Sequence, residues 1–316
     1  MGSGAGLLSA QSAPEKSLDP RWTAVGGAAV LSLTAAFTKL ADTTSATTVF
    51  YRCLIAAVPL AFLAMREISR RGAPEHGDMG LYVLAGALLG IDFATWTQSV
   101  AMVGAGIGTV LNNAQALAVP LLAWVFFRER IPMRFVIALP VMFAGLAMAG
   151  GALGGDSSAD GSPLVGTALG LVSGIAYAGY IVIVGSMRSG SRPYTQVLVS
   201  TVAAGVVGTA VATVWGGIDI APGLESIGWL VALALGGQML GWLLIGTALP
   251  ALSAPVGASL LLLQPALAVL IAMVLLHERP TSLQLVGCVL VVAVVGAVSM
   301  SPRPRRGGGL PVLPER

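Results

Sequence analysis

Three ionisable side chains fall inside long apolar stretches of this sequence: Lys39, Arg52 and Asp92. Because a charge inside membrane hydrocarbon costs roughly 3 kcal/mol or more, such residues mark substrate paths or proton relays by default. Asp92 lies near the middle of its stretch, where a carboxyl group could carry a proton, or could neutralise Lys39 or Arg52 and lock helices together. For Lys39, pairing with Asp42, pairing with Asp92 and contact with a substrate carboxylate all stay open. The position of Arg52 near a helix end favours a structural or gating role over substrate contact.

A second group of candidates consists of amide side chains. Gln115 and Gln264 each lie in the middle third of an apolar stretch, and Asn112 shares a helical face with Gln115 because the two are three residues apart. Hydrocarbon offers no hydrogen-bond partner, so these amides must either line a polar cavity or bond to neighbouring helices. For Gln115 and Gln264 we favour the cavity, where they would bind the polar part of a substrate.

Aromatic side chains form a third group. Trp96 follows Asp92 by four residues, Trp242 has a similar place in the second half of the chain, and Tyr177 and Tyr180 share one helical face. Aromatic residues with a polar tip suit a mostly apolar ligand pocket with a few polar groups. The two tryptophans lie too deep in their stretches to be interface anchors, so core packing and pocket lining are the alternatives for them.

The elements that must position these side chains are membrane-spanning helices. Apolar residues make up 56% of the 316 residues and charged residues 10%, with a mean hydropathy of +0.86. Ordinary soluble domains carry about 25% charged residues, so we predict an all-α integral membrane protein. A helix needs about 20 apolar residues to span a bilayer. We expect ten spans, at residues 22–41, 45–65, 80–101, 106–127, 132–152, 163–184, 194–215, 227–248, 254–276 and 281–300.

The chain contains an internal repeat. Residues 105–151 correspond to residues 254–300 after a shift of 149 positions, which is the separation of Glu129 and Glu278. Matches among Ala, Leu and Val carry little weight in such a sequence, but a Gln and a Glu-Arg pair at the same offset indicate a duplication. The matched pairs include Gly108/Gly257, Gln115/Gln264, Glu129/Glu278 and Arg130/Arg279.

Basic residues set the predicted orientation, because cytoplasmic loops of membrane proteins are rich in Lys and Arg. With both termini in the cytoplasm, nearly all loop Lys and Arg residues lie inside, whereas Arg279 and loop acids such as Asp219 lie outside. Five helices per repeat is an odd number, so the second copy must enter the membrane from the opposite side. The predicted fold is therefore ten transmembrane helices as two inverted five-helix repeats. Many secondary transporters have this arrangement, with the substrate site near the midplane.

Two polar corners, Arg128-Glu129-Arg130 and His277-Glu278-Arg279, each close one apolar stretch and precede another that contains glycine. The other parts of the pattern are Gly108, Gly257, the pair Gln264-Pro265, Arg52 and Lys39. Over residues 22–300 the sequence resembles the drug/metabolite transporter superfamily, of the ten-helix type with two EamA domains. The resemblance implies transport of small metabolites, commonly export of amino acids and related compounds.

These observations predict an organisation and a function. We expect a secondary transporter in a bacterial inner (plasma) membrane that exports small amphipathic metabolites such as amino acids, aromatic ones included. Its partners would be the substrate, the lipid bilayer and protons as a candidate coupling ion, and it would act as a monomer or weak dimer. The expected segments are a cytoplasmic segment at 1–21, a first EamA-type five-helix repeat at 22–152, an external linker at 153–162, a second such repeat at 163–300 and a cytoplasmic tail at 301–316.

Other classes have less support. A sugar-phosphate or nucleotide-sugar exchanger would need several in-span cations, and only Lys39 and Arg52 are present. A membrane enzyme would need clustered His, Asp or Cys residues at membrane depth, but both histidines fall in predicted loops and Cys53 and Cys288 lie in separate stretches. A passive scaffold would not need amides in the middle of its spans. No phosphate-binding Gly-Lys-Ser/Thr loop is present, and we predict no enzyme activity, cofactor, metal site or nucleic-acid partner.

Overall fold

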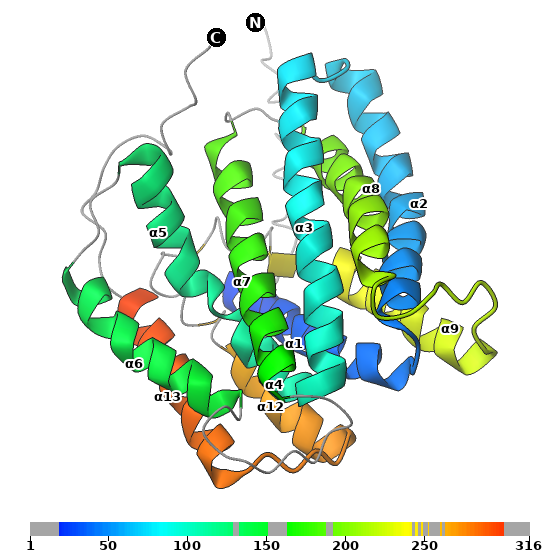
Figure 1. Cartoon of the computed structure of the whole chain (residues 1–316). Coiled ribbons are helices and arrows are strands. Elements are labelled where there is room, and N and C mark those ends of the chain that lie inside the picture. Colours follow the sequence, from blue (N-terminus) through cyan, green and yellow to red (C-terminus); the bar gives the residue numbers. More distant parts are fainter. Residues whose placement is uncertain are drawn as a thin grey trace, which may run out of the picture.

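The computed structural model describes residues 19–128, 133–150, 163–187, 192–241 and 263–299, together with positions 244, 245, 248, 252 and 260. This part of the chain consists of helices and connecting turns, with no β-strand (Figure 1). The helices are α1 (Pro20–Leu40), α2 (Ser45–Arg71), α3 (His76–Val103), α4 (Ala105–Asn112), α5 (Gln115–Phe127), α6 (Met133–Ala149), α7 (Pro163–Ser186), α8 (Pro193–Ala212), α9 (Leu224–Val231), η1 (Ala232–Gly241), α12 (Leu263–Leu275) and α13 (Ser282–Ser299).

The described helices fall on the predicted spans. Seven helical stretches are long and apolar enough to cross a membrane, with α4 and α5 counted as one stretch and α9 and η1 as another. Three further apolar helices, within α6, α12 and α13, are shorter than 18 residues in the described part of the chain. The all-helical, multi-pass architecture is thus the expected one.

Polar side chains fix where the first helices begin. Asp19 precedes α1, and its carboxylate accepts a hydrogen bond from the backbone N–H of Arg21 at 2.9 Å. Thr44 precedes α2, and its hydroxyl accepts from the backbone N–H of Thr47 at 3.1 Å. Each cap satisfies a backbone donor that the first turn of a helix would leave unpaired, so these two starts follow from local sequence.

Two predicted spans are not continuous α-helices. The fourth breaks at a turn at residues 113–114, which separates α4 from α5. The eighth begins as α9 and continues as a π-helix, η1. A π-helical turn rotates the side chains that follow it and occurs often at functional sites. Both interruptions bear on the candidate site, because α4 and η1 each carry one of its residues.

The helices of the first half of the chain pack mainly against those of the second half. Helix α3 packs against α7 and α8, and α1, the counterpart of α7, packs against η1 and α12. Helix α2 packs against α8, its own counterpart, and α6 packs likewise against α13. In Figure 1, α2, α3, α7 and α8 run side by side, and the pair α6 and α13 crosses beneath α5. The main contacts of the fold therefore join the first repeat to the second.

Small residues allow the closest of these contacts. A Cβ atom added to Gly86 of α3 would lie 2.5 Å from the carbonyl oxygen of Ser200, and one added to Gly90 would lie 2.7 Å from that of Ala204. Both partners are in α8, so any larger residue at these glycines would force α3 and α8 apart. This is the way in which small residues at regular spacing bring helices together in membranes.

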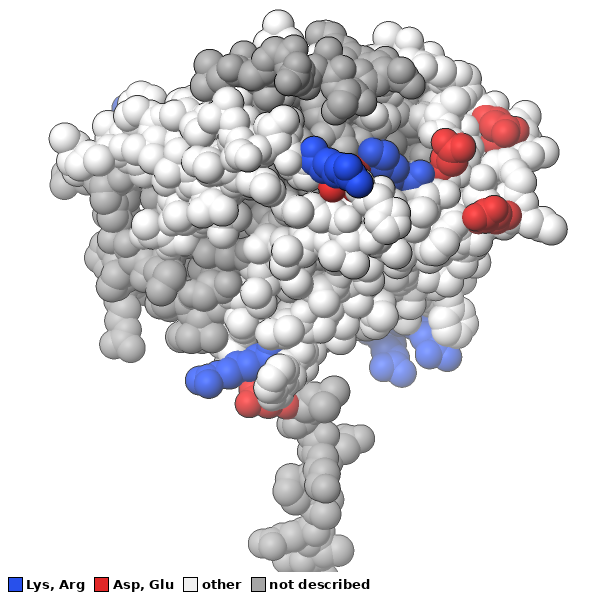
Figure 2. Space-filling model, turned by 90° about the horizontal axis from the view of Figure 1, so that it is seen from below, with Lys and Arg blue, Asp and Glu red and all other residues white. Residues whose placement is uncertain are grey.

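The surface has the character of a protein in a bilayer. Large apolar side chains are strongly exposed on several helices, as Val58, Phe62, Val274 and Val289 show. Charged side chains are sparse and lie in small separate groups on the end of the molecule seen in Figure 2. Such a surface would be unfavourable in water, where exposed apolar patches are normally small.

Candidate functional site

Asp92 of α3 is the buried carboxylate of the site, with 6% of its surface exposed. Its Oδ1 atom accepts hydrogen bonds from the side-chain amide of Asn112 at 2.9 Å and from the hydroxyl of Ser173 at 2.6 Å. Asn112 is the last residue of α4, just before the turn that ends this helix, and Ser173 lies in α7. The carboxylate therefore joins two helices of the first half to one helix of the second.

Arg52 of α2 is the buried cation of the site, also 6% exposed. Its Nε and Nη2 atoms donate to one acceptor, Oε1 of Gln238 in η1, at 3.1 and 3.0 Å. The guanidinium lies 3.8 Å from the ring centroid of Phe93 and 5.7 Å from that of Trp96. A guanidinium over an aromatic face is stabilised by the quadrupole of the ring. We call Asp92, Asn112, Ser173, Arg52 and Gln238 the inter-repeat polar cluster.

The two charges do not form an ion pair with each other. Within the described residues the one ion pair is that between Lys39 and Glu278. Asp92 is bonded by neutral donors and Arg52 by a neutral acceptor, although Phe93, which lies under the guanidinium, directly follows Asp92 in α3. Burying an ionisable group without a partner of opposite charge costs free energy, and such groups within membrane-spanning helices mark functional sites by default.

Tyr177 and Tyr180 of α7 lie close to this cluster. Their rings stack with centroids 5.9 Å apart and an angle of 10° between the planes. They pack against the apolar group that includes Phe93 and Leu89. The structure therefore brings together six residues that the sequence singled out, namely Arg52, Asp92, Trp96, Asn112, Tyr177 and Tyr180.

Lys39 is not part of this group. Its ammonium donates to Oε1 of Glu278 at 2.8 Å, at the point where α1 ends and the corner between α12 and α13 begins. Its partner is thus neither Asp42 nor Asp92, the two acids considered from the sequence. The charge network expected for Lys39, Arg52 and Asp92 is divided between two places in the fold.

Glu278 also holds the start of α4. Its Oε1 accepts from the backbone N–H of Ala105 at 2.8 Å, and its Oε2 accepts from that of Gly106 at 3.4 Å. Gly104, just before the helix, has φ of +96°, and a Cβ atom there would lie 2.8 Å from Oε2 of Glu278. Only glycine fits at this position, because a side chain would be strained and would displace the carboxylate. The corner of the second repeat is thereby fixed to a helix of the first.

The two equivalent glutamines have different surroundings. Oε1 of Gln115 is buried and has no hydrogen-bond partner among the described residues. Gln264 is partly exposed, and its backbone carbonyl accepts from the hydroxyl of Ser32 at 3.1 Å. Neither side chain is bonded to the inter-repeat polar cluster, and their cavity role stays a prediction. Trp242 lies outside the described residues.

Three contributors were missed by sequence reasoning: Ser173, Gln238 and Phe93. Gln238 gave a signal, because it is an amide inside an apolar stretch, four residues before Trp242. Ser173 gave none, since one serine in a helix rich in Gly, Ala and Ser is ordinary. Phe93 is an apolar residue among many, and its role depends on which face of α3 Arg52 approaches.

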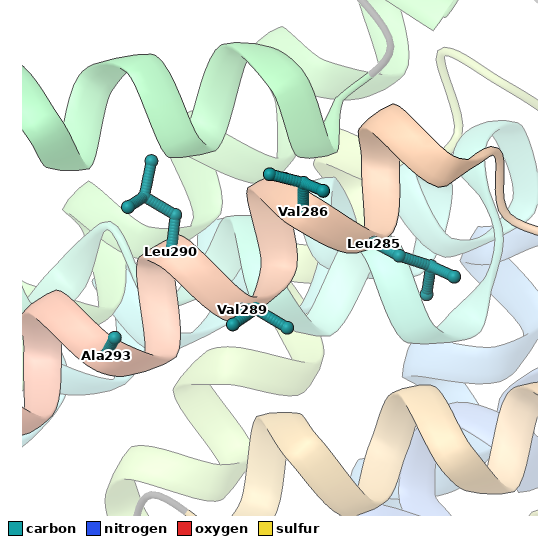
Figure 3. Close-up of a pocket in the computed structure, with 5 residues that line it drawn as sticks. All are labelled: Leu285, Val286, Val289, Leu290 and Ala293. Atoms are coloured by element: carbon teal, nitrogen blue, oxygen red, sulfur yellow. The ribbon is translucent and has the colours of Figure 1, made fainter.

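A groove runs along α13, but it has a different character. It has a volume of about 340 Å³ and is lined by apolar side chains alone (Figure 3), which are Leu285, Val286, Val289, Leu290 and Ala293. A ligand site normally combines apolar walls with a few convergent polar groups. We therefore assign this groove to the lipid-facing surface and the candidate site to the inter-repeat polar cluster.

The fold and the site together define a multi-pass helical membrane protein whose polar residues meet between two halves, an arrangement common in membrane transporters. The EamA-like transporter family model matches residues 22–151 and again residues 164–300. The chain therefore belongs to the EamA-like transporter family, and the resemblance seen in the sequence is confirmed. No curated protein matches the chain. A protein of known crystal structure shares the fold, with a TM-score of 0.55 and 16% identity over 88% of this chain and 97% of its own.

Proposed function

We propose that the chain is a secondary transporter that moves small amphipathic metabolites by alternating access. One observation carries this proposal: two buried opposite charges, Arg52 and Asp92, are each bonded by a residue of the other repeat, Gln238 and Ser173. Any movement of one repeat against the other must change the surroundings of both charges. Membership of a transporter family supports the same class.

We propose the inverted topology for the same molecule, with both termini in the cytoplasm of a bacterium and the linker 153–162 outside. The odd number of spans per repeat supports it, as does the placement of the basic loop residues. A cysteine at Arg128 and one at Arg279, each introduced alone, should react with a membrane-impermeant thiol reagent from opposite sides of the membrane. Reaction of both from one side would contradict the inversion.

We propose amino acids, including aromatic ones, as substrates and efflux as the direction. The aromatic side chains beside the cluster support an amphipathic substrate, because Phe93, Trp96, Tyr177 and Tyr180 supply apolar walls next to charged groups. The sugar-phosphate alternative has less support, since Lys39 is paired with Glu278 and leaves Arg52 as the cation of the cluster. Uptake of a mixed metabolite pool into proteoliposomes, with and without a pH gradient, tests both.

Asp92 is the proposed proton carrier. Its hydrogen-bond donors, Asn112 and Ser173, are neutral, so the carboxyl group can gain or lose a proton without breaking an ion pair. Asp92→Asn should abolish uphill transport driven by a pH gradient and spare exchange of labelled for unlabelled substrate, because an amide cannot carry the proton. Glu225→Gln, at an exposed acid in the first turn of α9, is the control. Equal uphill transport by Asp92→Asn would remove Asp92 from this role.

A further inference from the structure

Among the described residues, the side-chain hydrogen bonds of Arg52 go to one neutral oxygen. A guanidinium has five N–H donors in a planar fork, and here two of them converge on a single oxygen of Gln238. Within the described residues no other acceptor reaches Arg52. A buried guanidinium is best matched by a carboxylate, which offers two oxygens in the same plane and the opposite charge.

Arg52 and Asp92 belong to one cluster, yet they have separate partners. Asp92 directly precedes Phe93, the ring on which the guanidinium lies, yet its Oδ1 is bonded by Asn112 and Ser173. Pairing Asp92 with Arg52 would reduce the cost of burying two charges, because a buried charge is most costly when no opposite charge compensates it. Each group instead has neutral hydrogen-bond partners, which groups of a ligand could replace.

We infer that Arg52 binds the carboxylate of the transported molecule, and that the amide of Gln238 occupies this place when no ligand is bound. This inference rests on the proposed transport function and names the part of the substrate that the site recognises. A side-chain oxygen of Asp92 in the same cluster can accept a hydrogen bond from the ammonium group of the same molecule, and the amide in Asp92→Asn keeps such an acceptor, so the class of ligand is a zwitterion with an apolar side chain. Arg52 then contacts the substrate directly, contrary to the structural or gating role expected from the sequence.

The aromatic residues position the guanidinium for this contact. Phe93 lies against its face at 3.8 Å, with Trp96 at 5.7 Å. Stacking on the face leaves the N–H edge of the group for hydrogen bonds in its plane, where a carboxylate binds with both oxygens. The same rings offer an apolar wall for the side chain of the ligand.

Replacement of the Gln238 amide by a ligand carboxylate at Arg52 would also connect ligand binding to movement of the repeats. Gln238 belongs to η1 of the second repeat and Arg52 to α2 of the first, so a carboxylate that displaces the amide removes a contact between the repeats. A ligand shifts a conformational equilibrium only through a difference in its binding to the two states. Competition with Gln238 supplies that difference, because the ligand binds better where the amide is already released.

Transport by the full-length protein in proteoliposomes tests the inference. The first probe is a mixture of labelled L-leucine, L-phenylalanine and L-tryptophan, and the second is a mixture of the three corresponding amides, which keep the ammonium and the side chain. The wild type should prefer the amino acids by about tenfold or more, because each amide lacks the charge that Arg52 recognises. Arg52→Gln should abolish this preference.

Arg66→Gln is the matched control, because Arg66 lies in the same helix and also stacks on a ring, that of Phe62 at 4.2 Å, but is exposed. It should keep the preference. A second variant, Gln238→Glu, places a permanent carboxylate on Arg52 and should lower amino-acid transport about tenfold while purifying as a folded protein. Gln238→Ala should instead lower the KM for the amino acids, because the competing amide is gone.

The possible results separate this inference from the proposed function. Equal transport of the amino acids and the amides by the wild type would overturn it, and so would an undiminished preference in Arg52→Gln. If the wild type moves neither mixture but accumulates another compound from the mixed metabolite pool, the zwitterion inference is wrong and the transport function stands. If it moves nothing from any pool, both are wrong.

Discussion

Glu67 and Glu278 perform the same task at opposite ends of the molecule in different ways. Each carboxylate crosses from one repeat to the other and caps the start of a helix there: Glu67 bonds α8 and Glu278 bonds α4. They lie at the two ends of the bundle, since α2 runs from the vicinity of Lys39 to Glu67 over about 33 Å at 1.5 Å per residue. The repeats are therefore joined by polar contacts at both ends, with Arg52 between them.

The surroundings of the two acids differ. Oε2 of Glu67 accepts from the backbone N–H of Thr195 at 2.8 Å and from its hydroxyl at 2.9 Å, and no cation lies within ion-pair distance among the described residues. Glu278 adds an ion pair with Lys39, whose side chain is 39% exposed. The buried carboxylate of Glu67 is thus stabilised by a helix N-terminus and a hydroxyl, and the partly buried carboxylate of Glu278 by a helix N-terminus and a partly solvated cation.

Near Glu67, a second contact joins the end of α2 to the start of α8. The guanidinium of Arg192, just before α8, donates to the backbone carbonyl of Arg71 at the end of α2 at 2.8 Å. An anion at a helix start and a cation at a helix end both oppose the partial charges of the helix dipole. A carboxylate can therefore be buried in this fold without an ion pair where the partial charges of helix ends stabilise it.

The largest expected effect is the loss of the buried cap. Glu67→Ala leaves the backbone N–H and the hydroxyl of Thr195 without their acceptor, and should lower the free energy of unfolding by about 2 kcal/mol. Thermal unfolding of the purified protein in detergent would measure it as a lower midpoint. Glu67→Gln, which keeps an acceptor oxygen, should recover part of the loss.

Glu75→Ala is the control for that prediction. Like Glu67, Glu75 is a glutamate beside the start of a helix, here α3. It is exposed, and its side chain does not cap that helix. Its replacement should change the unfolding free energy by less than about 0.5 kcal/mol. If Glu75→Ala and Glu67→Ala lowered the midpoint equally, the cap would not be the source of the effect.

The span pattern could be predicted from the sequence because it depends on local composition. Long apolar stretches and their polar ends give the helices of α1, α2, α3, α7 and α8 nearly in full, and the Glu-Arg pairs mark the repeat. The interruptions could not be predicted in the same way. The change from α9 to η1 and the turn between α4 and α5 lie within apolar sequence that would also suit a continuous helix.

Partners of charged groups were the least predictable part. Asp92, Arg52 and Lys39 stood out because each is a charge in apolar surroundings, a property of the local sequence. The partner of Lys39 is 239 positions away, and that of Arg52 is 186 positions away. Such contacts depend on how the repeats pack. Local reasoning left Asp42, Asp92 and a substrate carboxylate open as partners of Lys39, and Glu278 was not among them.

The smallest expected effect is the loss of the ion pair between Lys39 and Glu278, and its dependence on salt distinguishes the Glu278 end from the Glu67 end. Lys39→Met removes the cation and leaves Glu278 bonded to Ala105 and Gly106, so the helix cap should persist. Because an exposed ion pair is screened by solvent and salt, we expect a loss of about 0.5 kcal/mol at low ionic strength and none in about 0.5 M NaCl. Unfolding midpoints of the wild type and the variant at both salt concentrations would measure this.

The same measurement on Glu67→Ala completes the comparison. Its effect should be nearly independent of salt, because hydrogen bonds to backbone and hydroxyl groups at a buried position are screened little. A salt-sensitive loss at Glu67 would mean that a distant cation contributes there. If Lys39→Met lowered the free energy of unfolding by more than about 2 kcal/mol at both salt concentrations, the cap of α4 would depend on the lysine. Glu278 would then need its cation to cap a helix, whereas Glu67 does not.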